Sequence, residues 1–259
     1  MQFDVYTACV EIAASIVFVL AVLLGSYVQG VTGFAFSMII MAAVVAVQAG
    51  EVPPLAAAIS FLSLVNVLFA LHGHYRKING KLLVALSAGQ IPAIACGVWL
   101  LTILDENAEA LVELLLGTFV ALGSLSMVIR PKPIAKASSF LHGSVAGALG
   151  GIVGGMFAAS GPVIGWFCYR QPLPIAVIRA TLLGGFIVTA VTRTVVVGLQ
   201  GALTFDVWIM TATGLPVVAV GTLLGRRFPP RLSPIAMRRA VFSLTFAIGI
   251  WIFAAALVR

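Results

Sequence analysis

Residues 147–162 read GALGGIVGGMFAASGP, and residues 25–37 read GSYVQGVTGFAFS. Both stretches interrupt apolar runs with glycine, which permits backbone conformations of positive φ and the close approach of a second segment. Inside a membrane, such interruptions are tolerated where the backbone is buried in protein or lines a cavity. The two stretches therefore predict an all-α membrane protein with helices broken near the middle of the bilayer.

The composition supports a polytopic membrane protein. Of the 259 residues, 61% are hydrophobic and only 9% are charged, whereas soluble proteins carry about a quarter charged residues. A spanning helix needs about 20 apolar residues, so the length allows roughly eight to ten spans and no soluble domain beside them. The net charge of +7 falls mostly in short loops, which favours a role in membrane topology over nucleic-acid binding. The lipid bilayer is thus an expected partner, nucleic acid is not, and a homodimer is left open.

The second half of the chain repeats the first. We expect apolar segments at residues 10–29, 33–49, 54–73, 82–104 and 110–129, and again at 140–153, 159–169, 174–198, 207–225 and 238–257. Identical residues recur at offsets from 121 to 126 positions, as in Gly30 and Gly151, Gly33 and Gly154, Pro53 and Pro174, Pro92 and Pro216, and Gly123 and Gly249. Internal duplication is frequent in secondary transporters. We place the first membrane repeat at 1–135 and the second at 136–259, within a single membrane domain.

The loop charges predict that the two repeats have opposite orientations. Basic loops at 76–81, 130–136 and 226–239 are expected in the cytoplasm, and the acidic stretch 105–109 outside. Both conditions hold only if residues 140–169 enter the membrane and return, as a re-entrant hairpin with arms shorter than about 20 residues. Residues 10–49 are the counterpart from the other side, although the sequence leaves open whether they cross fully. Each half would then hold one glycine-broken re-entrant hairpin plus about three transmembrane helices, arranged as inverted repeats.

The helix breaks are the predicted substrate site. A helix that begins after a break presents free N–H groups and the positive end of its dipole, which suits an anion. Hydroxyl and amide side chains in the breaks add donors, and two arginines within residues 174–198 add charge. The candidate substrate-binding residues are Gln29, Gly30, Thr32, Gly33, Phe36, Gly154, Ser160, Gly161, Arg179 and Arg193. The alternative roles are tight helix packing for the glycines and snorkelling to the interface for the arginines.

Other polar residues have weaker assignments. His72 is a weak candidate for proton coupling, since histidine titrates near neutral pH, and a solvated loop-end residue is its alternative role. Asn66 and Gln90 are expected to form hydrogen bonds between helices. No Asp or Glu lies near the middle of an expected span, so the sequence offers neither a buried carboxylate relay nor a counter-charge for a cationic substrate.

An enzyme is not expected. The sequence contains no HExxH, GxSxG, CxxC or P-loop motif, and its cysteines, Cys9, Cys96 and Cys168, are far apart. We therefore predict no catalytic residues, no metal site and no cofactor.

The order of these motifs resembles a known family. The patterns Gly30-x-x-Gly33-x-Ala35-Phe36 and Gly151-x-x-Gly154-Gly155, with Gly161-Pro162 following, are similar to those of the sulfite exporter TauE/SafE family. So are Arg179-Ala180-Thr181 after Pro174, and the Pro-x-x-x-x-Gly elements at 92–97 and 216–221. The resemblance implies a multi-pass inner-membrane permease for sulfite, organosulfonates or related anions.

We therefore expect a secondary transporter that moves a small anion by alternating access. Two alternatives remain at this stage: an anion channel, and a membrane subunit of a complex that transports nothing itself.

Overall fold

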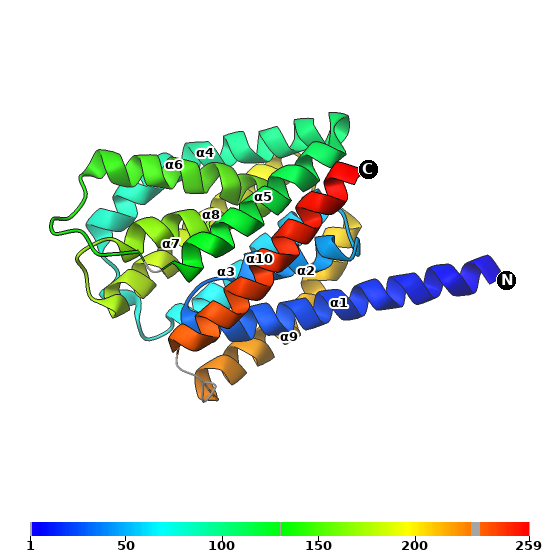
Figure 1. The fold of residues 1–259 in the computed structure, drawn as a ribbon, viewed down its shortest axis with the longest axis horizontal. Helices are drawn as coiled ribbons and strands as arrows, with labels where there is room; N and C mark the ends of the chain where they lie inside the picture. Colours follow the sequence, from blue (N-terminus) through cyan, green and yellow to red (C-terminus); the bar gives the residue numbers. More distant parts are fainter. Residues whose placement is uncertain (1, 130, 229–233, 259) are drawn as a thin grey trace.

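The computed structural model describes residues 2–129, 131–228 and 234–258, with side chains omitted for 2–11, 107, 109, 234–235 and 237–238. The described residues form α-helices and one short 3-10 helix at Tyr75–Lys77, without β-strands (Figure 1). The first-half helices are α1 (Gln2–Thr32), α2 (Phe36–Ala46), α3 (Val52–Leu71), α4 (Gly80–Asn107) and α5 (Glu109–Val128). Those of the second half are α6 (Phe140–Phe157), α7 (Gly161–Tyr169), α8 (Ile175–Leu199), α9 (Phe205–Arg227) and α10 (Pro234–Val258).

The fold is that of a polytopic α-helical membrane protein, as predicted. Within the described residues, 8 helices are long and apolar enough to cross a bilayer: α1, α3, α4, α5, α6, α8, α9 and α10. The outer surface carries large apolar side chains such as Leu122 and Trp251, which are more than 60% exposed. A soluble protein rarely shows so apolar a surface, whereas lipid tails accept it.

Helices from the two halves pack against each other through glycine. On α6, Gly143, Gly147, Gly151 and Gly155 recur every four residues and form one face, which lies against α4. A Cβ at Gly151 would lie 2.6 Å from the carbonyl oxygen of Gln90, so only glycine permits this spacing. Similar close contacts join α1 to α9 and α5 to α10. Each of these pairs combines one helix from residues 1–135 with one from residues 136–259.

This packing decides where the second break falls within the predicted stretch 147–162. Helix α6 continues through Gly154 to Phe157, four residues past the predicted end at 153. The glycines at 147–155 remain helical because they allow close helix contact, and the backbone turns at Ala158, which has φ 54°. The first break falls at Gly33 (φ 88°) and Ala35 (φ 91°), inside the predicted stretch.

The two hairpins also have unequal arms. Helix α6 has 18 residues, within the predicted arm length of less than about 20, and it is also a candidate span, as is α1. The return arms are short: α2 has 11 residues and α7 has 9, or roughly 16 and 14 Å at about 1.5 Å per residue. Neither return arm can cross the roughly 30 Å core of a bilayer, so each begins inside the protein.

The bundle has a basic end and an acidic end. In Figure 1, the loops after α3, α5 and α7 lie at the left of the view, and both chain termini lie at the right. The loops after α3, α5 and α7 contain basic residues, including Lys77, Lys132 and Arg170. Glu51 precedes α3 and Asp105 lies in the last turn of α4, the ends of these helices that are away from the α3–α4 loop. Arg231, expected in the same basic group, lies outside the described residues.

Candidate functional site

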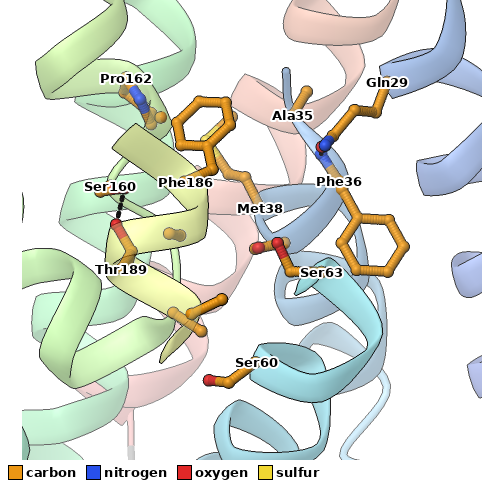
Figure 2. A pocket seen from close by; sticks show the side chains of 15 residues that line it. Gln29, Ala35, Phe36, Met38, Ser60, Ser63, Ser160, Pro162, Phe186 and Thr189 are labelled. Carbon is orange, nitrogen blue, oxygen red and sulfur yellow. Dashed lines mark hydrogen bonds between the residues drawn. The ribbon is translucent and has the colours of Figure 1, made fainter. Parts of the chain in front are cut away.

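The two helix breaks meet at a buried cavity. Ala35 and Phe36 come from the α1–α2 break, and Ala158 to Gly161 from the α6–α7 break; all line the cavity. Figure 2 shows Ser160 and Thr189 on one side and Gln29 and Phe36 on the other. Helix α3 contributes Ser60 and Ser63. The free volume is about 30 Å³, room for roughly two water molecules. We call this space the central cavity.

Two helices begin at the central cavity. Helix α2 starts at Phe36 and α7 at Gly161, and both first residues line the cavity. The first-turn N–H groups of a helix have no partner within it, so the N–H groups of Ser37, Met38 and Gly161 are free of helical bonds. The positive ends of both helix dipoles therefore point towards one space. This arrangement attracts negative charge without any charged side chain.

The first break is braced by its own side chains. Oε1 of Gln29 accepts a hydrogen bond from the backbone N–H of Phe36 at 3.1 Å, capping α2. The hydroxyl of Thr32 lies 2.8 Å from the carbonyl oxygen of Val28 and 2.9 Å from that of Phe34. These two acceptors share its single hydrogen. Thr32 does not line the central cavity, so its contribution is to the shape of the break. The Nε2 group of Gln29 is buried and has no hydrogen-bond partner among the described residues.

The second break is held against α8. Oγ of Ser160 lies 2.9 Å from Oγ1 of Thr189, a hydrogen bond drawn in Figure 2. Gln90 of α4 donates to Thr189 and to the carbonyl oxygen of Gly185, at 3.0 Å for the latter. This confirms the prediction that Gln90 links helices. Gly154 does not line the cavity, but a Cβ there would lie 3.0 Å from Thr189 Cγ2 and 3.1 Å from Ser160 Cβ. Its lack of a side chain lets these two residues meet.

Arg193 is buried one turn beyond Thr189 on α8. Its side chain is 1% exposed, with Nε donating to the carbonyl oxygen of Gly155 at 2.8 Å and Nη1 donating to Oγ of Ser60 at 3.2 Å. Within the described part of the chain it forms no ion pair. Burying a cation without a counter-charge is costly, and such residues in membrane proteins mark functional sites.

The structure separates the two candidate arginines. Arg179 and Arg193 lie roughly 20 Å apart along α8 at about 1.5 Å per residue. Arg179 lines a second cavity of about 220 Å³ at the basic end, together with Gly30 and Gly33. Gln29 lines both cavities. His72 is exposed at the C-terminal end of α3 and lines neither.

Several cavity residues were not predicted. Nothing in the sequence indicated that Thr189 and Phe186 line a cavity, because threonine and phenylalanine are ordinary residues in apolar helices. Ser60 and Ser63 are three residues apart on one face of α3, a pattern that could have indicated a polar stripe. Asn66 follows one turn later and is fully buried, yet neither its Oδ1 nor its Nδ2 has a partner within residues 2–129, 131–228 and 234–258, so its expected helix–helix hydrogen bond is absent there.

A bundle of membrane spans in which two broken helices point their N-termini into a buried polar cavity defines a membrane transport protein. Residues 17–252 match the family described as "Sulfite exporter TauE/SafE", and the chain belongs to this family. Its members are transporters, which confirms the prediction that the chain is not an enzyme. The protein is a multi-pass inner-membrane protein.

Two relatives agree with this assignment. The chain is 37% identical over 225 residues to the "Probable sulfite/organosulfonate exporter TauE" of Cupriavidus necator, covering 87% of this chain and 88% of the relative. It is 28% identical over 187 residues to the "Probable inner membrane transporter protein TsaS" of Comamonas testosteroni, covering 70% of this chain and 75% of the relative. No solved structure matches the chain.

Proposed function

We propose that the protein is a secondary transporter that moves sulfite, an organosulfonate or a related small anion across the inner membrane by alternating access. The observation that carries this proposal is Arg193, a fully buried cation without an ion pair in the described chain, beside a cavity at which two helices begin. An anion in the central cavity would offset the cost of burying that charge.

The binding residues follow from the geometry. The backbone N–H groups at the starts of α2 and α7 supply donors, and Ser160 supplies a hydroxyl. Gln29 has an amide nitrogen without a partner, and Arg193 supplies charge from behind Ser60. Phe36 and Gly161 shape the wall. A sulfonate or sulfite group has three oxygens arranged around sulfur, which matches donors that converge from several elements.

The small cavity supports alternating access. The free volume of the central cavity is only about 30 Å³, so we propose that the cavity widens to load and release its substrate. We propose that the two repeats are inverted, with the basic end in the cytoplasm.

Uptake by purified protein in liposomes tests the proposal. The anions to compare are sulfite, sulfoacetate, sulfate, lactate and chloride. We expect saturable uptake of a sulfur oxyanion and exchange of labelled external anion for unlabelled internal anion. Flux that neither saturates nor exchanges would identify an anion channel. Folded protein that moves none of these anions, and that co-purifies with a fixed partner, would instead be a non-transporting subunit.

A further inference from the structure

The second cavity is a basic vestibule. It lies at the end of the bundle that carries the basic loops and has a volume of about 220 Å³. Three cations line it: Lys77 after α3, Arg179 of α8 and Arg226 of α9. No Asp or Glu is among the described residues that line it. By contrast, a cavity of about 250 Å³ at the opposite end is lined by Glu51, Asp105 and Glu113.

Contacts with the rest of the bundle position two of the vestibule cations, Arg226 and Arg179. Nη1 of Arg226 donates to the carbonyl oxygen of Phe69 near the end of α3, a bond of 2.5 Å that ties α9 to α3. The stem of Arg179 packs at the α1–α2 break, where a Cβ at Gly33 would lie 3.6 Å from Arg179 Cγ. Its Nε atom is buried and has no hydrogen-bond partner in the part of the chain that the structure describes. Fixed cations with unused donors form a site for an oxyanion.

We propose that this vestibule is a second anion-binding site, which takes a small sulfonate or carboxylate from the cytoplasm and passes it to the central cavity through Gln29. The order of the two sites rests on the proposed transport function, but binding in the vestibule does not.

Gln29 joins the two cavities. Its side chain is 2% exposed, it lines both cavities, and its Nε2 group has no partner. Asn66 lies one helical turn from Ser63, which lines the central cavity, and one turn from Ala70, which lines the vestibule. Both polar atoms of Asn66 also lack partners. Unpaired buried polar groups between two anion sites are the contacts that a passing anion would use.

Thiol labelling measures the charge preference of the vestibule, and it does not require transport. Ala176 is exposed and lines the vestibule, one turn before Arg179. An Ala176→Cys variant, with the three native cysteines replaced, would react with two methanethiosulfonates of equal size, an anionic sulfonatoethyl and a cationic trimethylammonioethyl reagent. Liposomes of neutral lipid avoid a lipid surface charge. We expect the anionic reagent to react faster, with protection by sulfoacetate.

Matched variants separate local charge from general surface charge. Arg226→Gln should lower the ratio of anionic to cationic reaction rates about tenfold, because one lost charge changes each rate about threefold in opposite directions. Arg227→Gln removes the same charge from the adjacent residue, which lies over the ring of Phe228 and does not line the vestibule. It should leave the ratio within about twofold. Ser139→Cys gives the reference ratio for the basic end.

The vestibule site is overturned if Arg226→Gln and Arg227→Gln lower the ratio equally, or if Ala176→Cys and Ser139→Cys give the same ratio. It is also overturned if added phosphatidylglycerol protects Ala176→Cys whereas sulfoacetate does not, since the cations would then serve a lipid headgroup. Selective labelling in protein that transports no anion would support the vestibule and contradict the proposed function. Saturable transport with unselective labelling would support the proposed function and contradict the vestibule.

Discussion

Nη1 of Arg193 donates a hydrogen bond to Oγ of Ser60 at 3.2 Å, and Ser60 in turn donates to the carbonyl oxygen of Ala56 at 2.9 Å. Because a serine hydroxyl has one hydrogen, Ser60 has no donor left for a ligand in the central cavity. It holds the guanidinium in place behind the cavity wall. The charge of Arg193 therefore acts on the cavity through its field, and Ser60 acts by positioning it.

Replacing Arg193 should reduce transport strongly while the protein stays folded. Arg193→Gln keeps an N–H donor for Gly155 but removes the charge, so we expect uptake to fall about 10- to 100-fold, as for a lost charge-assisted interaction of about 1.5–3 kcal/mol. Arg193→Lys should retain part of the activity. Ser60→Ala should raise the half-saturating concentration with a smaller effect on maximal rate. Full uptake by Arg193→Gln in liposomes would remove Arg193 from the mechanism.

Gln29 offers a test that separates capping from substrate contact. Gln29→Glu keeps an oxygen to accept from the N–H of Phe36 but places a negative charge between the cavities. We expect a melting temperature near that of the wild type and loss of anion uptake. Gln29→Met removes the cap as well and should lower stability by about 1 kcal/mol. Melting temperature and uptake are measured on the same preparations. Normal uptake by the Gln29→Glu protein would contradict the passage of anions from the vestibule to the central cavity past Gln29.

Ser160 is expected to contribute to affinity. Its hydroxyl can turn from Thr189 to a bound anion, so Ser160→Ala should raise the half-saturating concentration about 10-fold, equivalent to about 1.4 kcal/mol. Ser126→Ala is the matched control, because that hydroxyl bonds to Gly123 on α5, away from the cavity. Equal effects of the two variants on binding would show that Ser160 has only a structural role.

Two glycines three residues apart on α6 should fail in different ways. Gly154→Leu forces Ser160 and Thr189 apart, so we expect protein in the membrane that does not transport. Gly151→Leu pushes α6 away from α4 and should reduce the amount of folded protein instead. Gly80→Ala, with nothing within 4 Å of the added Cβ, is the control. Membrane abundance and uptake, measured separately, distinguish these outcomes.

The proposed topology predicts opposite labelling of the two ends. Ser139→Cys, in the loop before α6, should react only from the cytoplasmic side, and Ala202→Cys, between α8 and α9, only from the outside. Both residues are exposed. Intact cells and everted vesicles treated with an impermeant thiol reagent give the two accessibilities. External labelling at position 139 would refute the assigned orientation.

Most of the fold could be predicted because its causes are local. The apolar runs gave segment positions close to the helices observed, and glycine with flanking polar residues indicated both breaks. The exact break at Ala158 could not be predicted, because Gly154 and Gly155 look like helix breakers in isolation and remain helical only through contact with other helices. The same contacts make α6 long enough to be a candidate span.

By itself, the sequence determined a polytopic membrane protein with a duplicated pattern, since hydropathy and repeats depend only on residue order, and it predicted an anionic substrate. Only the tertiary structure placed Arg193 beside the central cavity and Arg179 in a separate vestibule, and only it brought Thr189 against Ser160. Which side chains share a cavity depends on helix rotation and on how closely glycine lets two backbones approach. Those quantities are set by packing between residues far apart in the chain.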